Sequence, residues 1–209
     1  MIHWLIFSVV LGLVACSKSN TNLADTYHIW SVPASKVYDG GSGTDGIPPI
    51  DNPTYIDTEK AYVSDDQTII GIKFGETVRA YPHNILNWHE IVNESLEDGI
   101  TQNLTVSYCP LTGSSFLWES FQDSSDPTFG NTGFLYNSNL VMYDRETKSI
   151  WSQMLGAAIN GPLREKKTTT LPILVTTWAS WKKCIPILNY CQMRLASVAI
   201  TTGRRTIII

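Results

Sequence analysis

Short runs of β-branched and aromatic residues, each followed by turn residues, recur along this 209-residue chain and restrict it to a mostly β fold. The clearest run is 68–74 (TIIGIKF). Gly75-Glu76 then predicts a hairpin turn, and residues 78–81 are expected to form the partner strand. Further strands are expected at 104–109, 115–119, 140–143 and 150–154.

One helix is expected at 82–93. Pro82 fits the first helical position, where no amide hydrogen is needed, and apolar residues then recur at near-helical spacing (Ile85, Leu86, Trp88, Ile91 and Val92). The predicted fold class is therefore α+β, mostly antiparallel β with one or two short helices, in a single domain. In strand 104–109, Val106 and Tyr108 are expected on one face, with Ser107 and Cys109 on the other.

The N-terminus has the features of a lipoprotein signal peptide. Residues 4–15 (WLIFSVVLGLVA) form an apolar run too short to cross roughly 30 Å of hydrocarbon as a helix, and they suit a signal-peptide core. The run ends at Cys16 in a pattern that resembles the bacterial lipobox. That resemblance implies that residues 1–15 are removed and that Cys16 carries a lipid anchor. The alternative is that Cys16 is an ordinary buried cysteine.

The same resemblance implies a place in the cell envelope. No aspartate follows Cys16 as an inner-membrane retention signal, so we expect the outer membrane, with the protein facing the periplasm. Residues 16–28 are then a tether, and residues 29–183 form the domain.

The charge of the chain bears on its partners. The net charge is −4, which argues against nucleic acid as a partner. Hydrophobic residues make up 43% of the chain, enough for a sizeable core, so a folded domain is expected rather than a disordered one.

Cys109 is the first candidate for chemistry. It ends a predicted strand and precedes a turn in which the backbone amides of Thr112, Gly113 and Ser114 could form an anion-binding nest. A thiol nucleophile needs a base, and we predict His89 for that role, oriented by Glu90 or by Asp144.

Metal binding is a second use for the same residues. Cys109 and His89 could bind a Cu or Zn ion, with His83, Glu90 or a residue missing from the C-terminus completing the site. The structural alternative is that Cys109 is an inert buried side chain and that His89 bonds a carbonyl.

A polar and aromatic group supplies the predicted ligand-binding residues, which are Tyr81, Asn139, Asp144, Arg145 and Gln153. Arg145 could clamp a carboxylate or a phosphate, Asn139 could bind a polar ligand, and Gln153 could reach the site. The alternative is turn chemistry, with Asp144 and Arg145 forming only a local ion pair.

Several motifs occur in an order that resembles the bacterial "domain of unknown function 3179" (DUF3179) family, over about residues 29–183. The matching segments are 45–50 (DGIPPI), 79–82 (RAYP), 85–93 (ILNWHEIVN), 108–114 (YCPLTGS), 129–130 (FG), 133–140 (GFLYNSNL), 143–145 (YDR), 151–153 (WSQ) and 176–182 (TTWASWK). The resemblance implies an exported or membrane-anchored domain and brings no established activity.

The chain departs from this family pattern at its end. Residues 184–209 contain three arginines and no acidic residue. We hypothesise that a frameshift replaced the native C-terminus. The alternative is a divergent but genuine pair of C-terminal strands.

Two functional hypotheses follow. The working hypothesis is a thiol- or metal-dependent enzyme, or a metal-binding protein, of the cell envelope that uses Cys109 and His89. The alternative is a non-catalytic module that binds a small molecule or a protein in a groove lined by Tyr, Trp and Asn side chains. A sulfur-to-imidazole distance within about 4 Å in a cleft favours the first, and a Cys109 enclosed by apolar side chains favours the second.

Overall fold

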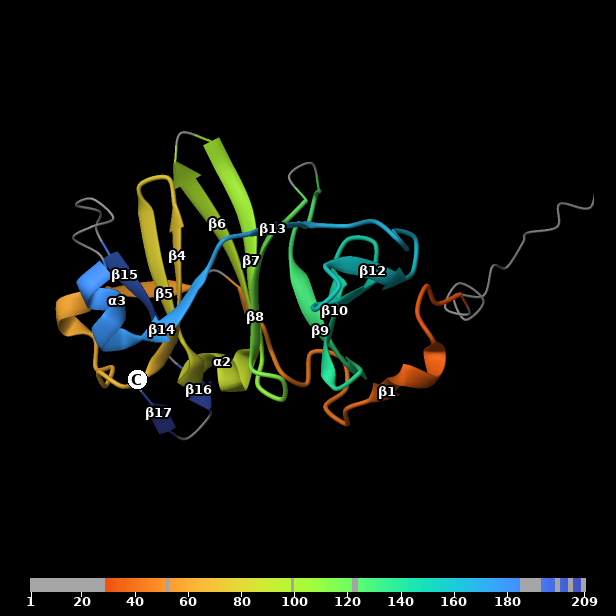
Figure 1. Cartoon of the computed structure of the whole chain (residues 1–209), viewed down its shortest axis with the longest axis horizontal. Coiled ribbons are helices and arrows are strands. Elements are labelled where there is room, and N and C mark those ends of the chain that lie inside the picture. Colours follow the sequence, from red (N-terminus) through yellow and green to blue (C-terminus); the bar gives the residue numbers. More distant parts are fainter. Residues whose placement is uncertain are drawn as a thin grey trace, which may run out of the picture.

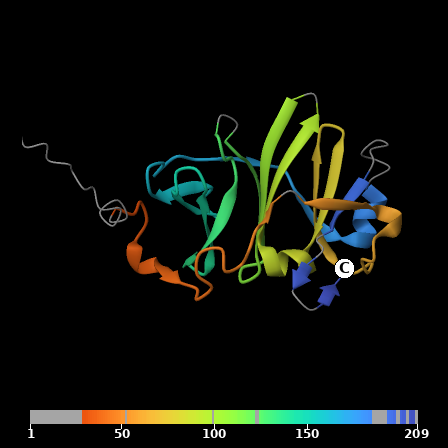
Figure 2. The ribbon, with the colours of Figure 1, turned by 180° about the vertical axis from the view of Figure 1, so that it is seen from behind.

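The structure is a computed structural model of the chain that describes residues 29–51, 53–98, 100–121, 124–184, 193–197, 200–202 and 205–207. Three five-stranded sheets, here named A, B and C, follow one another along the long axis with sheet B in the middle (Figure 1). The view from behind shows the same order (Figure 2). The strands are mainly antiparallel, and two short α-helices accompany them in one domain, which confirms the predicted fold class.

Each sheet combines distant parts of the chain. Sheet A contains, in spatial order, β1 (Val37–Asp39), β9 (Phe129–Tyr136), β10 (Asn139–Asp144), β11 (Ile150–Ser152) and β12 (Ala157–Asn160). Sheet B contains β13 (Thr169–Leu171), β8 (Ser114–Glu119), β7 (Ile100–Cys109), β6 (Ile91–Asp98) and β2 (Ile50–Asp51). Sheet C contains β14 (Leu174–Thr177), β4 (Thr68–Phe74), β5 (Thr77–Pro82), β15 (Met193–Ser197) and β3 (Thr54–Asp57). The remaining elements are α2 (His83–His89), α3 (Trp178–Cys184), the 3-10 turns η1 (Ala34–Lys36) and η2 (Thr58–Lys60), and the strand pair β16 (Ile200–Thr202) and β17 (Arg205–Ile207).

Sheet B is covered on both faces, and the side chains of β7 alternate between them. Val106 and Tyr108 belong to the core that sheet B shares with sheet C and α2, whereas Cys109 belongs to the core shared with sheet A. The alternation predicted for 104–109 is therefore confirmed. All residues from Leu104 to Cys109 are buried, because both faces of the sheet are covered along this stretch.

The predicted hairpins are also confirmed. Strands β4 and β5 pair in antiparallel fashion, with Phe74 opposite Thr77 across the Gly75-Glu76 turn. Strands β10 and β11 pair in the same way, with Met142 opposite Trp151. Local turn signals were sufficient here because the two strands of each hairpin are neighbours in sequence.

The second half of the predicted helix 82–93 is wrong. The helix ends at His89, and β6 begins at Ile91. Between them Glu90 adopts a φ of 58°, and its N–H donates to the carbonyl of Leu86 at 2.8 Å, which closes the last helical turn. The chain therefore changes direction at Glu90 and enters sheet B.

Packing explains this correction. Ile91 and Val92 are β-branched and contribute to the two different cores on either side of sheet B, which a helix could not achieve. The longer helix predicts Trp88 on its apolar face, but Trp88 is 71% exposed. The apolar repeat at 85–92 thus combines a short helical stripe with the start of a strand.

Indole rings cover the two outermost faces. Trp178 and Trp181 of α3 pack on the outer face of sheet C, and Trp30 packs against Val141 and Ile150 on the outer face of sheet A. These segments close the fold at its two ends.

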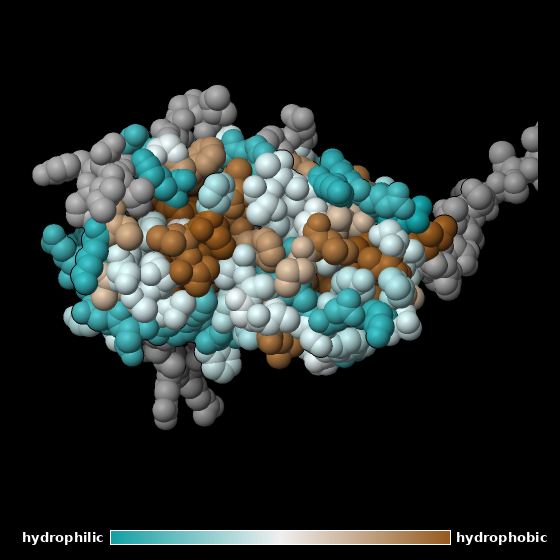
Figure 3. All heavy atoms as spheres, in the orientation of Figure 1, coloured by the Kyte–Doolittle hydropathy of each residue, from teal (hydrophilic) through white to brown (hydrophobic). Residues whose placement is uncertain are grey.

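One edge of sheet C carries apolar side chains at the surface. Strand β14 is the edge strand, and its Leu174 and Val175 are roughly half exposed. An apolar area lies over β14 on the face seen in Figure 3.

Part of the tail 184–209 forms strands. Strand β15 lies between β5 and β3, parallel to β5, with Met193 opposite Val78. Backbone pairing of this kind does not depend on which reading frame supplied the residues. The frameshift hypothesis therefore stays a prediction.

The predicted signal peptide 1–15, the lipidation residue Cys16 and the rest of the tether to residue 28 lie outside the described residues. In the part of the chain that the structure describes, no helix is long and apolar enough to cross a membrane.

Candidate functional site

Cys109 lies at the end of β7, in the core between sheets B and A. Its side chain is 1% exposed and packs in one cluster with Ile91, Leu140 and Met142. The thiol lies 4.0 Å from the carbonyl oxygen of Ser138, in the turn between β9 and β10. The sulfur is therefore enclosed by apolar side chains and the backbone of a turn.

A buried polar network lies on the same side of sheet B. The side-chain amide of Gln153 donates to Ser107 Oγ at 3.1 Å, and its carbonyl oxygen accepts from Ser114 Oγ at 2.9 Å. Asn139 Nδ2 also donates to the Gln153 oxygen at 2.9 Å and lies 2.9 Å from Thr112 Oγ1. The structure thus brings together two predicted ligand-binding residues, Asn139 and Gln153, and their amide donors contact protein atoms.

His89 and Cys109 do not share a hydrogen bond. His89 Nδ1 lies 2.8 Å from the carbonyl oxygen of Pro48, so Nδ1 carries the proton in the neutral ring. The other ring nitrogen, Nε2, is enclosed and has no hydrogen-bond partner among the described residues. Glu90 instead accepts a hydrogen bond from Asn131 Nδ2 on β9.

The described residues do not form a metal site of three or more ligands. No group of three or more His, Cys, Asp or Glu side chains there is close enough to hold an ion. His83 stacks on Tyr108, with ring centroids 4.2 Å apart, and Tyr108 faces the opposite core from Cys109. His83 is therefore on the other side of sheet B.

Asp144 and Arg145 are neighbours in sequence but contact different partners. Asp144 is 1% exposed and accepts from Trp151 Nε1 at 2.9 Å and from the Thr147 N–H at 2.6 Å. Arg145 forms an ion pair with Asp51, with Nη1 and Oδ2 2.8 Å apart. Asp144 therefore fixes the turn between β10 and β11, while Arg145 ties that turn to β2.

Tyr81 belongs to a separate cluster between sheets B and C. Its hydroxyl and that of Tyr55 donate to the two carboxyl oxygens of Glu94. Arg79 Nε lies 3.4 Å from the same carboxyl group, whose side chain is only 3% exposed. Burial raises the pKa of Glu94 and outweighs the hydrogen bonds that lower it. Burial beside this carboxyl group also raises the pKa of both tyrosines.

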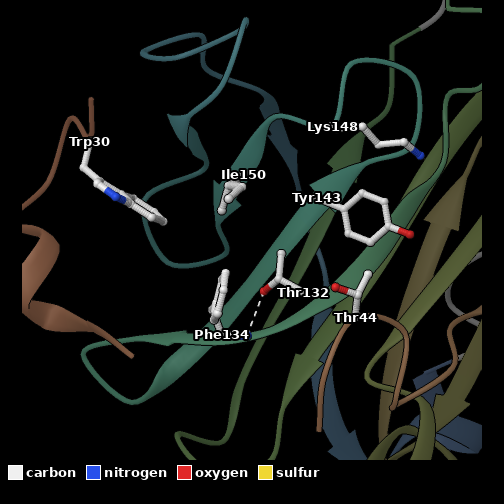
Figure 4. Close-up of a pocket in the computed structure, with 7 residues that line it drawn as sticks. All are labelled: Trp30, Thr44, Thr132, Phe134, Tyr143, Lys148 and Ile150. Atoms are coloured by element: carbon white, nitrogen blue, oxygen red, sulfur yellow. Dashed lines mark hydrogen bonds between the residues drawn. The ribbon is translucent and has the colours of Figure 1, made fainter. Parts of the chain in front are cut away.

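A cavity of about 500 Å³ lies on the outer face of sheet A (Figure 4). Seven residues line it: Trp30, Thr44, Thr132, Phe134, Tyr143, Lys148 and Ile150. Trp30 approaches from one side, and Tyr143 and Lys148 lie on the other (Figure 4). Its walls are mostly aromatic and aliphatic, as in many small-molecule sites.

Two hydroxyl groups in this cavity, those of Tyr143 and Thr132, already have partners in the protein. Tyr143 donates to Asp45 Oδ2 at 2.5 Å, and Thr132 donates to the carbonyl of Val141 at 2.6 Å. Burial and the bond to Asp45 raise the pKa of Tyr143, so its hydroxyl stays neutral. Lys148 Nζ lies 5.2 Å from the centre of the Tyr143 ring and forms no ion pair among the described residues. The cavity therefore presents an apolar surface with one available positive charge.

Comparison with known families assigns the chain. A family profile described as "Protein of unknown function (DUF3179)" matches residues 44–189, more than half of the sequence. The chain belongs to the DUF3179 family. No curated protein and no solved structure is significantly similar to it. The DUF3179 match begins after Trp30, so this one wall of the cavity comes from outside the matched region.

Sequence reasoning missed several residues that the DUF3179 fold brings together. Glu94 had a usable signal, because it alternates with Val92 and Leu96, and an acidic residue on a buried strand face needs partners. A helix predicted over 82–93 obscures that alternation, because Val92 then belongs to the helix. Trp30 and Lys148 carried no such signal, because only the folded sheet brings them to one cavity.

Glu90 is expected to make the stability of this DUF3179 domain depend on pH. Burial raises its pKa above the ordinary value of 4.5, although the hydrogen bond from Asn131 lowers it. A carboxyl group with a raised pKa in the folded state stabilises the fold below its unfolded pKa, and this contribution is lost as the pH rises through the folded pKa. The free energy of unfolding should therefore fall as the pH rises above about 4.5, and Glu90→Gln should make this fall smaller, because glutamine does not ionise.

Urea unfolding at a series of pH values measures this effect. Glu59→Gln, at an exposed position on η2, is the control and should leave the pH profile unchanged. An unchanged profile for Glu90→Gln would show that ionisation of Glu90 costs the folded state nothing.

Proposed function

We propose that this DUF3179 protein is a non-catalytic binding module of the cell envelope, which holds a small, largely apolar molecule in the cavity of Figure 4. One observation carries the proposal: the cavity has apolar walls, its Tyr143 and Thr132 hydroxyls are used by the protein, and Lys148 has no counter-ion among the described residues. A ligand with one anionic group fits these features, because the exposed ammonium group of Lys148 beside the apolar walls can pair with a negative charge.

The surroundings of Cys109 favour binding over thiol chemistry. A nucleophilic cysteine needs solvent access and a base within hydrogen-bonding reach. Cys109 is buried in an apolar cluster, and its polar neighbour is the carbonyl of Ser138 rather than the ring of His89. A Cys109 enclosed by apolar side chains is the arrangement expected of a binding module.

The envelope part of the proposal rests on the N-terminal sequence. We propose that Cys16 carries a lipid and that residues 17–28 tether the domain to the outer membrane on its periplasmic side. Twelve residues reach at most about 40 Å when fully extended. Trp30 follows this tether almost directly, so the cavity lies at the anchored end of the domain, which suits a ligand that partitions between membrane and water.

Two fluorescent probes of similar shape test the proposal. 1-Anilinonaphthalene-8-sulfonate is anionic, and N-phenyl-1-naphthylamine is neutral. Both are titrated against the full chain carrying Cys16→Ser, which cannot be acylated. We expect saturable binding of both, with a Kd of about 20 µM for the anionic probe and about 0.2 mM for the smaller neutral probe, from roughly 0.3 kcal/mol per heavy atom.

Substitutions in the cavity should separate the apolar and charged contributions. Thr44 is exposed at the rim, and Thr44→Trp should fill the cavity and weaken both probes about tenfold. Lys148→Gln should weaken only the anionic probe, by about threefold to fivefold. Lys73→Gln, at an exposed lysine on β4 outside the cavity, is the matched control.

Two results would contradict the proposal. In the first, Thr44→Trp leaves both probes bound as before, which would place their site elsewhere. In the second, Cys109→Ala abolishes binding while the far-ultraviolet circular dichroism is unchanged, which would favour a function that depends on the Cys109 thiol.

A further inference from the structure

A second hollow lies on the opposite side of sheet B from the cavity of Figure 4. It has a volume of about 380 Å³ and is lined by residues of β3, β5 and β6. Tyr55, Arg79, Glu94 and Glu97 line it, together with the hydroxyls of Thr77 and Ser95. Its polar walls distinguish it from the first cavity.

Arg79 is held in a fixed position here, and most of its hydrogen-bonding capacity is unused. Its guanidinium carbon lies 4.4 Å from the centre of the Tyr55 ring, and the side chain is 16% exposed. A guanidinium group has five N–H donors. Within the described residues, Nη1 donates to the carbonyl of Val78 at 3.3 Å, and the enclosed Nε faces the Glu94 carboxyl group at 3.4 Å.

Glu94 forms a salt bridge with Arg79 through Nε, but the carboxyl group is also shared with two tyrosines. The two carboxyl oxygens of Glu94 accept from the hydroxyls of Tyr55 and Tyr81, and Arg79 Nε stays 3.4 Å away. A close charge-assisted bond between these groups would be about 2.7–2.9 Å long. The tyrosines thus hold Glu94 in place and leave the outer edge of the guanidinium group to the hollow.

We propose that this hollow is a second ligand site, in which Arg79 binds the carboxylate of a small organic acid. The planar guanidinium group matches a carboxylate in a two-bond arrangement. Glu94 and Glu97 add negative charge around the hollow, so a singly charged anion is favoured over a doubly charged phosphate. This site is independent of the cavity in Figure 4.

Fluorine NMR with 3,3,3-trifluoropropionate tests the proposal. The probe is titrated against the full chain carrying Cys16→Ser and Thr44→Trp, in which the cavity of Figure 4 is filled, at about pH 8, where carboxylates are normally ionised. Line broadening and its competition by unlabelled propionate report binding in the hollow. Because the first cavity is blocked, failure here and failure of the proposed function give different results.

Two substitutions should act in opposite directions. Arg79→Gln should weaken the probe by about tenfold or more, because the charge and the fork of donors are both lost. Glu94→Gln keeps an oxygen acceptor for the tyrosines and removes a nearby negative charge, so it should tighten binding by about threefold to tenfold. Arg164→Gln, at an exposed arginine, is the matched control.

The Glu94 variant protects the test against simple unfolding, because a gain in affinity requires a folded site. Unchanged binding in both the Arg79 and Glu94 variants would overturn the proposal. Displacement of the probe by inorganic phosphate at the same concentration as propionate would overturn the preference for a single charge.

Discussion

Replacement of Asp144 by Ala is expected to lower the free energy of unfolding by about 3 kcal/mol. The carboxyl group is buried and accepts from the Thr147 N–H, the Thr147 hydroxyl and the Trp151 indole. Alanine would leave these donors without partners in a region that water does not reach. Each buried polar group left without a hydrogen-bond partner costs about 1–3 kcal/mol. The indole of Trp151 would be such a group, because Trp151 belongs to the core between sheets A and B.

Urea unfolding followed by tryptophan fluorescence measures this loss, and thermal unfolding should show a Tm roughly 6–12 °C lower. Asp144→Asn should be intermediate, because one oxygen acceptor remains. Asp66→Ala, at an exposed aspartate, is the control and should cost less than about 0.5 kcal/mol. A loss near zero for Asp144→Ala would mean that solvent replaces the carboxylate in the turn.

Gly130→Ala is expected to damage both the fold and the cavity of Figure 4. Gly130 lies opposite Tyr143 in the pair β9–β10, and the tyrosine ring covers it. A Cβ atom at Gly130 would lie 2.5 Å from Tyr143 Cε1 and 2.6 Å from Asp45 Oδ1. The ring and the segment around Asp45 must both move, which should cost about 1–3 kcal/mol.

The cavity gives Gly130→Ala a second readout. Tyr143 forms one wall, so binding of the neutral naphthylamine probe should fall by about tenfold even in protein that remains folded. Gly71→Ala is the matched control, because its Cβ would lie 2.5 Å from the ring of Trp181, far from the cavity. It should destabilise the fold to a similar degree and leave probe affinity per folded molecule unchanged. Equal loss of affinity in both variants would show that the effect is general instability.

The elements that sequence could predict are those determined by neighbouring residues. The β4–β5 hairpin follows from a β-branched run and a Gly-containing turn, and both of its strands lie within fifteen residues of Thr68. The alternation in β7 follows from strand geometry alone. The end of α2 could not be predicted in the same way, because Ile91 and Val92 become a strand only when sheets A and C are present on either side.

The candidate sites show the same limit. Asn139 and Gln153 were predicted as ligand-binding residues, and the fold brings them into contact with each other. Their partners, Ser107 and Ser114, come from a different sheet, and no local pattern indicates that pairing. Likewise, Arg145 is predicted to clamp a ligand, with an ion pair to Asp144 as the alternative, and its contact with Asp51 arises only from the three-dimensional arrangement.

Sheet B packs against a core on each of its two faces, and this affects how the protein unfolds. Consecutive residues of β6, such as Val92 and Asn93, support different halves of the molecule, with Asn93 bonded to the backbone of Phe129 at the start of β9. If sheets A and C were separated from each other, sheet B could cover only one of the two cores, and the other core would be exposed. We therefore expect the domain to unfold as a single cooperative unit, with neither side folding as an independent module.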